Sequence, residues 1–465
     1  MRLWVALAAS AALAVAAQPG SRQVVVTGGR VLDVASGRYR EATVVLDGDR
    51  IAAVQPPGDR LPDNAQRVEA TGQTIVPGLI DLDVQAAPGA ELDVSYFYAL
   101  SLAFGVTSLR AVDGALPWAV AQRDRVRRGD IVAPRLFAAG PGLSSRGGAG
   151  QAAPRFAGFG AGSPFVAVGD AASVTREVER QAGSGVDWVR TREGATVETV
   201  RAAVGAARKR QLRISAAPGA TAIAQLVQAR VNAVDGLRGP LAATEPPQHQ
   251  AATAVPPAAV AAEPTLDETW QRLKPADLRA AASVLAQARV TLIPRLRLDA
   301  ELSGQDDAAG REAELALLPD RLRTGRDDRG PRNPADGRGW RARAGFVKAV
   351  AGHRGVIAAG SGSAREGWPV PGLGLHRELS ALVAAGLSPA DAIRAATVAA
   401  AEALGAGGTL GQVRPGFRAD LFVVRGDPLA DVGALREITQ VIRGGEVQDR
   451  TVLLARAKRA ASPIR

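Results

Sequence analysis

At 465 residues the chain can bury a large core in two or three domains, and its 46% hydrophobic and 22% charged residues are those of a folded protein. The net charge of +11 comes almost entirely from arginine, but only 4% of the residues are aromatic. Because the arginines are scattered and few rings are present to stack on bases, we expect no nucleic-acid partner. The absence of cysteine excludes disulfides, thiol nucleophiles and thiolate metal sites.

The first 17 residues have the pattern of a signal peptide. Arg2 supplies the positive start, and residues 4–15 form an apolar run that is too short to span a bilayer. Small residues at 14–16 fit a cleavage site, and polar residues follow from Gln18. We therefore expect a secreted or periplasmic protein without a membrane span after cleavage. An uncleaved N-terminal anchor is the alternative.

Both ends of the mature chain have β-character. Residues 18–75 contain a valine run at 24–26 and a hairpin signal at Asp47-Gly48-Asp49. Residues 405–455 contain strand-like runs at 420–424 and 440–443, and residues 456–465 form a basic tail. Neither piece has enough apolar surface to fold alone. The two pieces are therefore expected to pack together as one small composite β-sandwich.

Between these ends, residues 76–404 alternate short β-rich runs with amphipathic helical stretches, which predicts parallel βαβ units. Eight such units over about 330 residues predict an α/β protein with a closed (β/α)8 TIM-like barrel. An open doubly wound sheet is the alternative, although no glycine-rich phosphate loop follows any predicted strand. Irregular insertions at 146–163 and 239–263 are expected to lie over the barrel mouth. The predicted strands are 79–84, 106–112, 135–139, 186–191, 212–216, 233–235, 290–294 and 356–359.

Five groups of residues spread over nearly the whole mature chain carry a family pattern. They are GGRVLD at 28–33 with DGDRI at 47–51, IVPGLID at 75–81, PGLGLHREL at 371–379, AGLSP at 385–389 with IRAAT at 393–397, and GQVRPGFRADL at 411–421. Together they resemble the amidohydrolase superfamily, in particular its imidazolonepropionase-like and prolidase-like members. The resemblance implies hydrolysis of carbon–nitrogen bonds, in amides or dipeptides, by zinc or another divalent cation at the barrel mouth.

The resemblance also implies where the metal ligands would stand. The family uses a His-x-His pair on the first strand, a carboxylated lysine or an acid on the fourth, histidines on the fifth and sixth, and an aspartate on the eighth. In this sequence the corresponding positions hold Asp83, Gln85, Arg190, Ala216, Gly236 and Gly362. The whole chain has three histidines, too few for this ligand set, and a guanidinium stays protonated and cannot be carboxylated. We therefore expect no metal and no other cofactor.

Other polar residues are candidates for lining a pocket, but none is predicted to be catalytic. They are Asp81, Glu193, Asp235, Ser361 and His376. Asp81 shares a strand face with Asp83 and Gln85, so an oxygen site for a hard cation is an alternative that the nearby arginine disfavours. Ser361 would need a histidine base to act as a nucleophile, and the sequence suggests none.

Two placements follow from charge and position. A buried Arg190 needs a partner, so it either pairs with Asp83 across the mouth or extends to water. His376 is expected at the start of the last barrel helix, where it orients a loop in preference to catalysis.

Three functional hypotheses remain open. The first is a pseudoenzyme that binds a small molecule at the barrel mouth or serves as an assembly scaffold. The second is a divergent hydrolase with a metal-free or single-metal site. The third is a structural partner of an active paralogue. The family resemblance favours self-association into a homo-oligomer.

Overall fold

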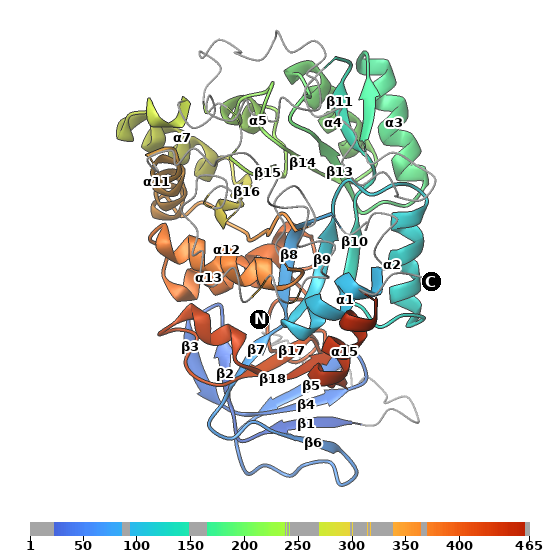
Figure 1. Ribbon diagram of the computed structural model, residues 1–465, viewed down its shortest axis with the longest axis vertical. Coiled ribbons are helices and arrows are strands. Elements are labelled where there is room, and N and C mark those ends of the chain that lie inside the picture. The colour runs from blue at the N-terminus through green and yellow to red at the C-terminus, as the bar shows by residue number, and fades with distance from the viewer. Residues whose placement is uncertain are drawn as a thin grey trace, which may run out of the picture.

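The computed structural model describes residues 23–85, 94–147, 165–237, 239, 241, 269–297, 300, 314, 317, 338–363 and 370–460. The predicted signal peptide, nearly all of the two predicted insertions and the end of the basic tail lie outside these residues. β-Sheets from both chain ends occupy one end of the molecule, and parallel strands with their helices occupy the rest (Figure 1). Among the described helices, none combines the length and the apolar character that crossing a membrane requires.

Two sheets form the end region. The four-stranded sheet has the order β5 (Arg50–Gln55), β4 (Thr43–Asp47), β1 (Val24–Thr27) and β6 (Gln66–Glu69). The six-stranded sheet has the order β19 (Glu446–Gln448), β18 (Ile438–Arg443), β17 (Leu421–Val424), β7 (Thr74–Pro77), β2 (Arg30–Asp33) and β3 (Arg38–Glu41). Because β17 pairs antiparallel with β7, the two ends of the chain share one sheet.

One hydrophobic cluster joins the inner faces of these two sheets. It contains Val26 and Val44 from the first sheet and Ile75, Leu421 and Ile442 from the second, all of them buried. The hairpin between β18 and β19 turns through two glycines in the left-handed region. A Cβ on Gly445 would lie 1.9 Å from the Gly48 carbonyl oxygen, so this close approach of two hairpin turns requires glycine.

The parallel strands form two sheets. The first has the order β10 (Arg135–Ala138), β9 (Val106–Ala111) and β8 (Leu79–Val84). The second has the order β12 (Phe165–Val168), β11 (Gly142–Ser145), β13 (Trp188–Thr191), β14 (Arg213–Ala216), β15 (Ala233–Asp235) and β16 (Thr291–Ile293). Seven of the eight predicted strands are therefore present, and β11 and β12 are strands that the sequence analysis did not predict.

The expected eighth strand is not formed. Residues 356–359 form an isolated parallel bridge from Ile357 to Leu292 and accept a backbone hydrogen bond from Leu82 of β8, and Ser363 forms another bridge to Val84. A third bridge, from Ala139 to Trp188, links β10 to β13. The segment from 358 to 363 consists of alanine, glycine and serine, which have little preference for extended structure. The described strands therefore do not form one continuous eight-stranded sheet.

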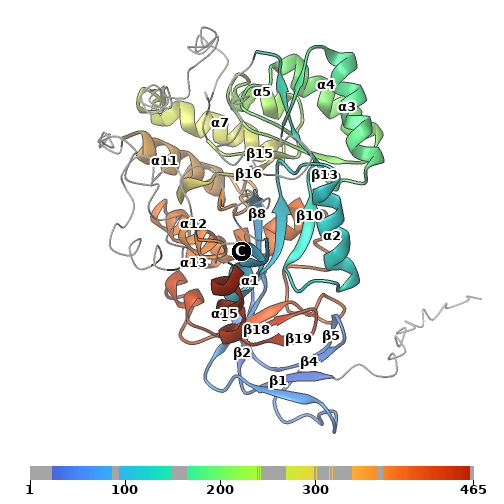
Figure 2. The same ribbon diagram turned by 45° about the vertical axis from the view of Figure 1, so that its right-hand side comes forward.

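Helices lie outside the parallel strands in both ribbon views (Figures 1 and 2). They are α1 (Val94–Ala103), α2 (Trp118–Arg128), α3 (Ala171–Gly183), α4 (Val197–Lys209), α5 (Ile223–Gln228), α7 (Pro275–Gln287), α11 (Arg338–Gly352), α12 (Leu373–Ala384) and α13 (Pro389–Ala395). The short helix α14 (Val398–Ala403) shares a hydrophobic cluster with Ile80 of β8 and Ala233 of β15. A 3-10 helix η2 (Val432–Arg436) and α15 (Arg450–Ala460) follow near the C-terminus.

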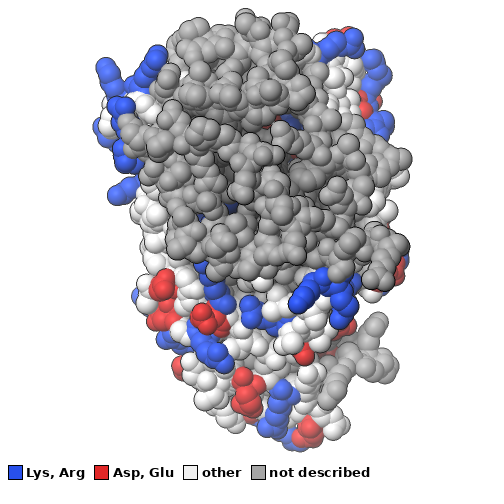
Figure 3. Space-filling model, in the orientation of Figure 1, with Lys and Arg blue, Asp and Glu red and all other residues white. Residues whose placement is uncertain are grey.

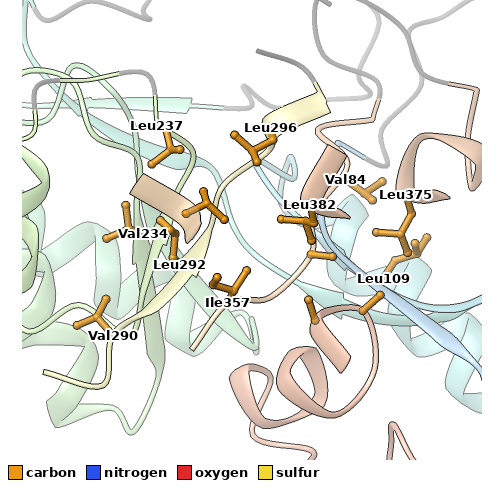
Figure 4. Close-up of a cluster of buried hydrophobic side chains, with 14 of the residues drawn as sticks. Val84, Leu109, Val234, Leu237, Val290, Leu292, Leu296, Ile357, Leu375 and Leu382 are labelled. Atoms are coloured by element: carbon orange, nitrogen blue, oxygen red, sulfur yellow. The ribbon is translucent and has the colours of Figure 1, made fainter. Parts of the chain in front are cut away.

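Apolar side chains fill the space between these strands and helices. Val234 and Leu292, on β15 and β16, lie beside Ile357, and Leu375 and Leu382 of α12 belong to the same cluster (Figure 4). The described surface on the face in Figure 3 carries separate groups of basic side chains with acidic ones among them. Other arginine and aspartate side chains, in contrast, are buried inside the molecule.

Candidate functional site

Charged side chains gather inside the molecule at the C-terminal ends of the parallel strands. Arg110 lies near the end of β9, Arg190 lies in β13 and Asp235 ends β15. Asp113 follows β9 after two residues. All four side chains are at most 1% exposed. Because the carboxyl ends of parallel strands meet on one face, residues distant in sequence converge there.

Asp235 lies at the centre of this cluster. Its carboxylate is 2.8 Å from Arg110 Nη2 and 3.0 Å from Arg190 Nε, and it accepts a 2.7 Å hydrogen bond from Ser215 Oγ. Burial alone would raise the pKa of Asp235, but the two guanidiniums lower it to about 2. Asp235 is therefore a fixed negative charge at neutral pH.

Arg190 pairs closely with two carboxylates, and a third, that of Glu193, lies 3.9 Å away; none belongs to Asp83. Its Nη1 lies 2.5 Å from Asp113 Oδ2, and its Nε contacts Asp235. Burial alone would lower the pKa of Arg190, but the carboxylates of Asp113, Asp83 and Asp235 raise it well above its usual range. The predicted Arg190–Asp83 pair was wrong because nearer carboxylates take the donors of Arg190. The alternative, an Arg190 that reaches water, was wrong too, since its side chain is 0% exposed.

Asp83 pairs instead with Arg295, which the sequence analysis missed. Arg295 Nη1 lies 3.1 Å from Asp83 Oδ2, and Nη2 donates a 3.0 Å hydrogen bond to the backbone oxygen of Asp235. Arg295 follows β16 with φ +57°, a conformation that turns its side chain away from the path of an ordinary strand end. The signal that could have found it is an arginine directly after a strand end, in Pro294-Arg295.

Gly236, at the position of the family's sixth-strand ligand, lies against this guanidinium. A Cβ on Gly236 would lie 2.1 Å from Arg295 Nη2. The guanidinium of Arg295 therefore occupies the space that a ligand side chain from position 236 would need. Ala216, at the fifth-strand position, is buried in the apolar cluster and offers no donor atom. Gly362 offers none either.

Asp81 contacts backbone groups, and no described guanidinium pairs with it. Its Oδ1 accepts hydrogen bonds from the backbone nitrogens of Ser361, at 2.8 Å, and Asp83, at 3.2 Å. The Ser361 and Ser363 hydroxyls bond to each other, and the Gln85 nitrogen donates to the Ser363 carbonyl at 3.0 Å. Burial raises the pKa of Asp81 to about 7, against the opposing effect of the Ser361 hydrogen bonds. Asp81 thus anchors the segment that replaces the eighth strand.

The remaining predicted residues lie at the edge of the cluster or away from it. Glu193 is 24% exposed and lies 3.9 Å from Arg190. His376, in contrast, is buried beside the end of α1, where its Nε2 lies 2.8 Å from the Phe104 carbonyl oxygen. Burial lowers the pKa of His376 to about 4. Since Phe104 precedes β9, His376 lies toward the N-terminal ends of the strands, and the structure does not bring it to the cluster.

A buried glutamate from the last predicted motif was also missed. Glu378 accepts hydrogen bonds from the backbone nitrogens of Leu296, at 3.0 Å, and Arg297, at 2.8 Å. It therefore holds the turn that carries Arg295. The sequence signal was an acidic residue within the apolar helix of the PGLGLHREL motif, and Arg110 gives the same kind of signal inside an apolar strand.

The cluster does not suit the divalent cation that the family uses. Guanidiniums of Arg110, Arg190 and Arg295 lie among the carboxylates of Asp83, Asp113 and Asp235, and positive charge stands where a cation would bind. Across the described ranges, no three His, Asp or Glu side chains are arranged to hold a metal ion. The six family positions therefore do not fit the metal.

Part of the sequence is similar to known proteins. Residues 372–448 match the Amidohydrolase family. Adenine deaminase 2 of Rhizobium etli is 34% identical over 149 residues, which are 29% of this chain and 24% of that protein. Adenine deaminase 2 of Agrobacterium fabrum is 35% identical over 150 residues, 30% of this chain and 25% of that protein. The chain thus aligns with about a quarter of the length of these relatives.

Solved structures match over a larger share of the chain. A Xaa-Pro dipeptidase with bound methionine has a TM-score of 0.67 and 18% identity, covering 92% of this chain and 100% of that one. Bottromycin amidohydrolase has a TM-score of 0.68 and 19% identity, covering 95% and 91%. These likenesses establish the mixed α/β fold. With the family match over residues 372–448 and the related deaminases, they support membership in the amidohydrolase superfamily.

Proposed function

We propose that this protein is an amidohydrolase-superfamily member that no longer performs metal-dependent hydrolysis and uses its fold as a binding or assembly scaffold. The related dipeptidase, amidohydrolase and deaminases support descent from enzymes that cleave carbon–nitrogen bonds. The observation that carries the proposal is the placement of Arg295, whose guanidinium fills the space beside Gly236 and neutralises Asp83.

The charges of the cluster balance without a metal ion. Three guanidiniums face three carboxylates, and the strand ends are thereby joined through side chains of the chain itself. A buried cluster of this kind is stable only when its partners satisfy one another. Binding a divalent cation would require at least one guanidinium to leave and would expose the remaining charges to repulsion.

We also infer that the two parallel sheets and residues 356–363 together form a closed barrel whose eighth strand is reduced to bridges. The isolated bridges of Ile357 and Ser363 support this inference. The shared hydrophobic cluster of the two end sheets supports a composite β-sandwich. A crystal structure in which the segment 356–363 lies apart from Val84 would contradict the barrel.

Export to the periplasm or medium is part of the proposal, supported by the apolar run at residues 4–15 after Arg2. The candidate partners of an exported scaffold are a small molecule at the barrel mouth, a second copy of this chain and an active paralogue. N-terminal sequencing of protein from a cell-envelope fraction tests export, and an intact Met1 in the cytoplasmic fraction would contradict it.

The test of the main proposal is metal content measured together with hydrolysis. We expect the full chain, purified without chelator, to contain no stoichiometric zinc, manganese or iron, and to show no chelator-sensitive hydrolysis of Xaa-Pro dipeptides or N-acyl amides. An active dipeptidase purified alongside is the control. One metal ion per chain, removed by chelator together with hydrolysis, would overturn the proposal.

A metal-free hydrolase is the second candidate, and Asp81 is the observation that favours it. A carboxyl with a pKa of about 7 beside the Ser361 and Ser363 hydroxyls can exchange a proton near neutral pH. Chelator-resistant hydrolysis that the Asp81→Asn variant loses, while the variant keeps wild-type thermal stability, would favour this candidate over the scaffold.

A further inference from the structure

A cavity of about 850 Å³ lies at the N-terminal ends of the parallel strands, on the opposite side from the buried cluster. Arg213 begins β14, Thr291 begins β16 and Asn232 directly precedes β15, and all three line this cavity. The residues at the C-terminal ends of the same strands, such as Asp235, belong to the buried cluster. The two features are therefore separate sites on one set of strands.

Four arginines line the cavity against a single carboxylate. They are Arg208, Arg213, Arg230 and Arg289, and the carboxylate is Glu402. Within the described ranges, none of these four guanidiniums forms an ion pair, and only Arg208 has a side-chain hydrogen bond, to the Arg230 carbonyl oxygen at 3.1 Å. Four like charges with only one carboxylate among them produce a positive potential in the cavity that favours anions.

The backbone brings two of these arginines to the cavity in a costly conformation. Arg230 and Arg289 follow the C-terminal ends of α5 and α7 with φ +60° and +52°. This left-handed position after a helix favours glycine, because a Cβ is disfavoured there. The same position after α11 holds Arg354, with φ +57°, which does not line the cavity.

The walls of the cavity are not only basic. Val227, Val231 and Val290 line it as well, together with Val356 and Ala403. Apolar side chains give an organic group a surface to pack on, whereas guanidiniums present planar pairs of donors that match the oxygens of a phosphate. The four guanidiniums and one carboxylate leave a net positive charge in the cavity, and two phosphate groups would neutralise it.

We propose that this cavity binds an organic diphosphate, a compact molecule that carries two phosphate groups on an apolar or aromatic body. Arg213, Arg230 and Arg289 hold the phosphates, and the valines contact the body. The proposal does not depend on the loss of metal-dependent hydrolysis, since no residue of the buried cluster takes part.

The test uses ADP as the probe and isothermal titration of the full chain at physiological salt. We expect saturable binding of ADP with a Kd in the micromolar range, weaker binding of pyrophosphate, and no binding of adenosine. Binding should weaken as salt rises because guanidinium–phosphate contacts are screened. Absence of saturable ADP binding below the millimolar range, or citrate binding as tightly as ADP, would overturn the proposal.

Matched glycine variants assign the binding to the cavity. Arg230→Gly and Arg289→Gly each remove one guanidinium from a position whose backbone favours glycine, so the fold should persist. Each should weaken ADP binding about tenfold, as expected for the loss of one charge-assisted contact. Arg354→Gly removes the same charge at an equivalent turn outside the cavity and should leave the Kd unchanged. Equal weakening by all three variants would overturn the assignment, since it would indicate a general effect of net charge.

Discussion

At the C-terminal ends of the parallel strands, Arg110 and Arg190 are buried and lie against carboxylates. At the N-terminal ends, Arg213 and Arg289 line an open cavity, and the described chain supplies no carboxylate to either as an ion-pair partner. The same residue type thus has two environments on one set of strands. The difference comes from the neighbouring residues. The C-terminal strand ends carry Asp113 and Asp235, whereas the charged residues near the N-terminal strand ends at the cavity are mainly arginines.

An arginine-rich composition therefore does not by itself indicate a function. A buried guanidinium with matched carboxylates is part of the internal structure, and removing one partner leaves a charge that water cannot reach. A guanidinium that lines a cavity and forms no ion pair with a carboxylate is available to a ligand. The two kinds of arginine should therefore differ in their effect on stability, in pH dependence and in backbone strain.

The largest effect is expected from breaking the buried cluster at its centre. Asp235→Asn keeps the size of the side chain but leaves Arg110 and Arg190 short of one carboxylate. We expect the free energy of unfolding to fall by about 3–5 kcal/mol, the usual result of removing one partner from a buried pair. Urea denaturation followed by circular dichroism measures this change.

Asp130→Asn is the control for that variant. Asp130 pairs with Arg128 at 2.7 Å, but both side chains are largely exposed, at 44% and 61%. A surface pair of this kind contributes about 0–1 kcal/mol. If the two variants lost equal stability, the buried cluster would not be the element that holds the strand ends together.

A buried basic group without a carboxylate partner should instead be neutral in the folded protein, and within the described chain His376 is such a group. Burial, with Arg436 and Arg450 nearby, lowers its pKa to about 4, whereas the unfolded chain has the ordinary value near 6.5. Between these values the unfolded state binds more protons. The stability from neutral His376 is therefore fully present above about pH 6.5 and is lost as pH falls toward 4, by about 3 kcal/mol in all.

The His376→Gln variant isolates this contribution. We expect the variant to be less stable than the wild type at pH 7 and the gap between them to narrow as pH falls to 4. Asp81 acts in the opposite direction, because burial raises its pKa to about 7 and stability falls as pH rises through that value. Comparing variant with wild type at each pH removes this common background. Parallel stability curves would show that His376 titrates normally.

Much of the fold could be predicted from the sequence because the signals were local. Seven runs of β-forming residues became strands, and Asp235 was placed at the end of its strand. The eighth run, residues 356–359, bonds through its backbone to Leu292 of β16 and Leu82 of β8 but is reduced to a single bridge. The alanine, glycine and serine residues from 358 to 363 have no strong preference for a strand and do not extend it. Beyond the run, the Ser361 nitrogen donates to the Asp81 side chain, a contact between residues 280 positions apart, which no local pattern reveals.

The site was harder to predict because partner choice depends on distance. From the sequence, a buried Arg190 was expected to need a carboxylate, with Asp83 on the first strand as its partner or contact with water as the alternative. The structure places Asp113 and Asp235 nearer, and Arg295 reaches Asp83 through a left-handed turn. The reach of a long side chain and the sign of one φ angle decided these pairs. Neither is encoded in spacing or hydrophobic pattern.

The smallest expected change in the free energy of unfolding comes from the arginines that line the cavity. It is an increase, whereas breaking the buried cluster causes a decrease. Arg289→Gly removes a Cβ from a residue with φ +52° at the end of α7. Because glycine adopts this conformation freely, we expect the free energy of unfolding to rise by about 0.5–1 kcal/mol. Arg213→Ala, at an ordinary strand position, should change stability by less than about 0.5 kcal/mol. Thermal denaturation without phosphate measures both. A loss above about 1 kcal/mol in Arg289→Gly would mean that this guanidinium has a structural partner, and the distinction between the two ends of the strands would then disappear.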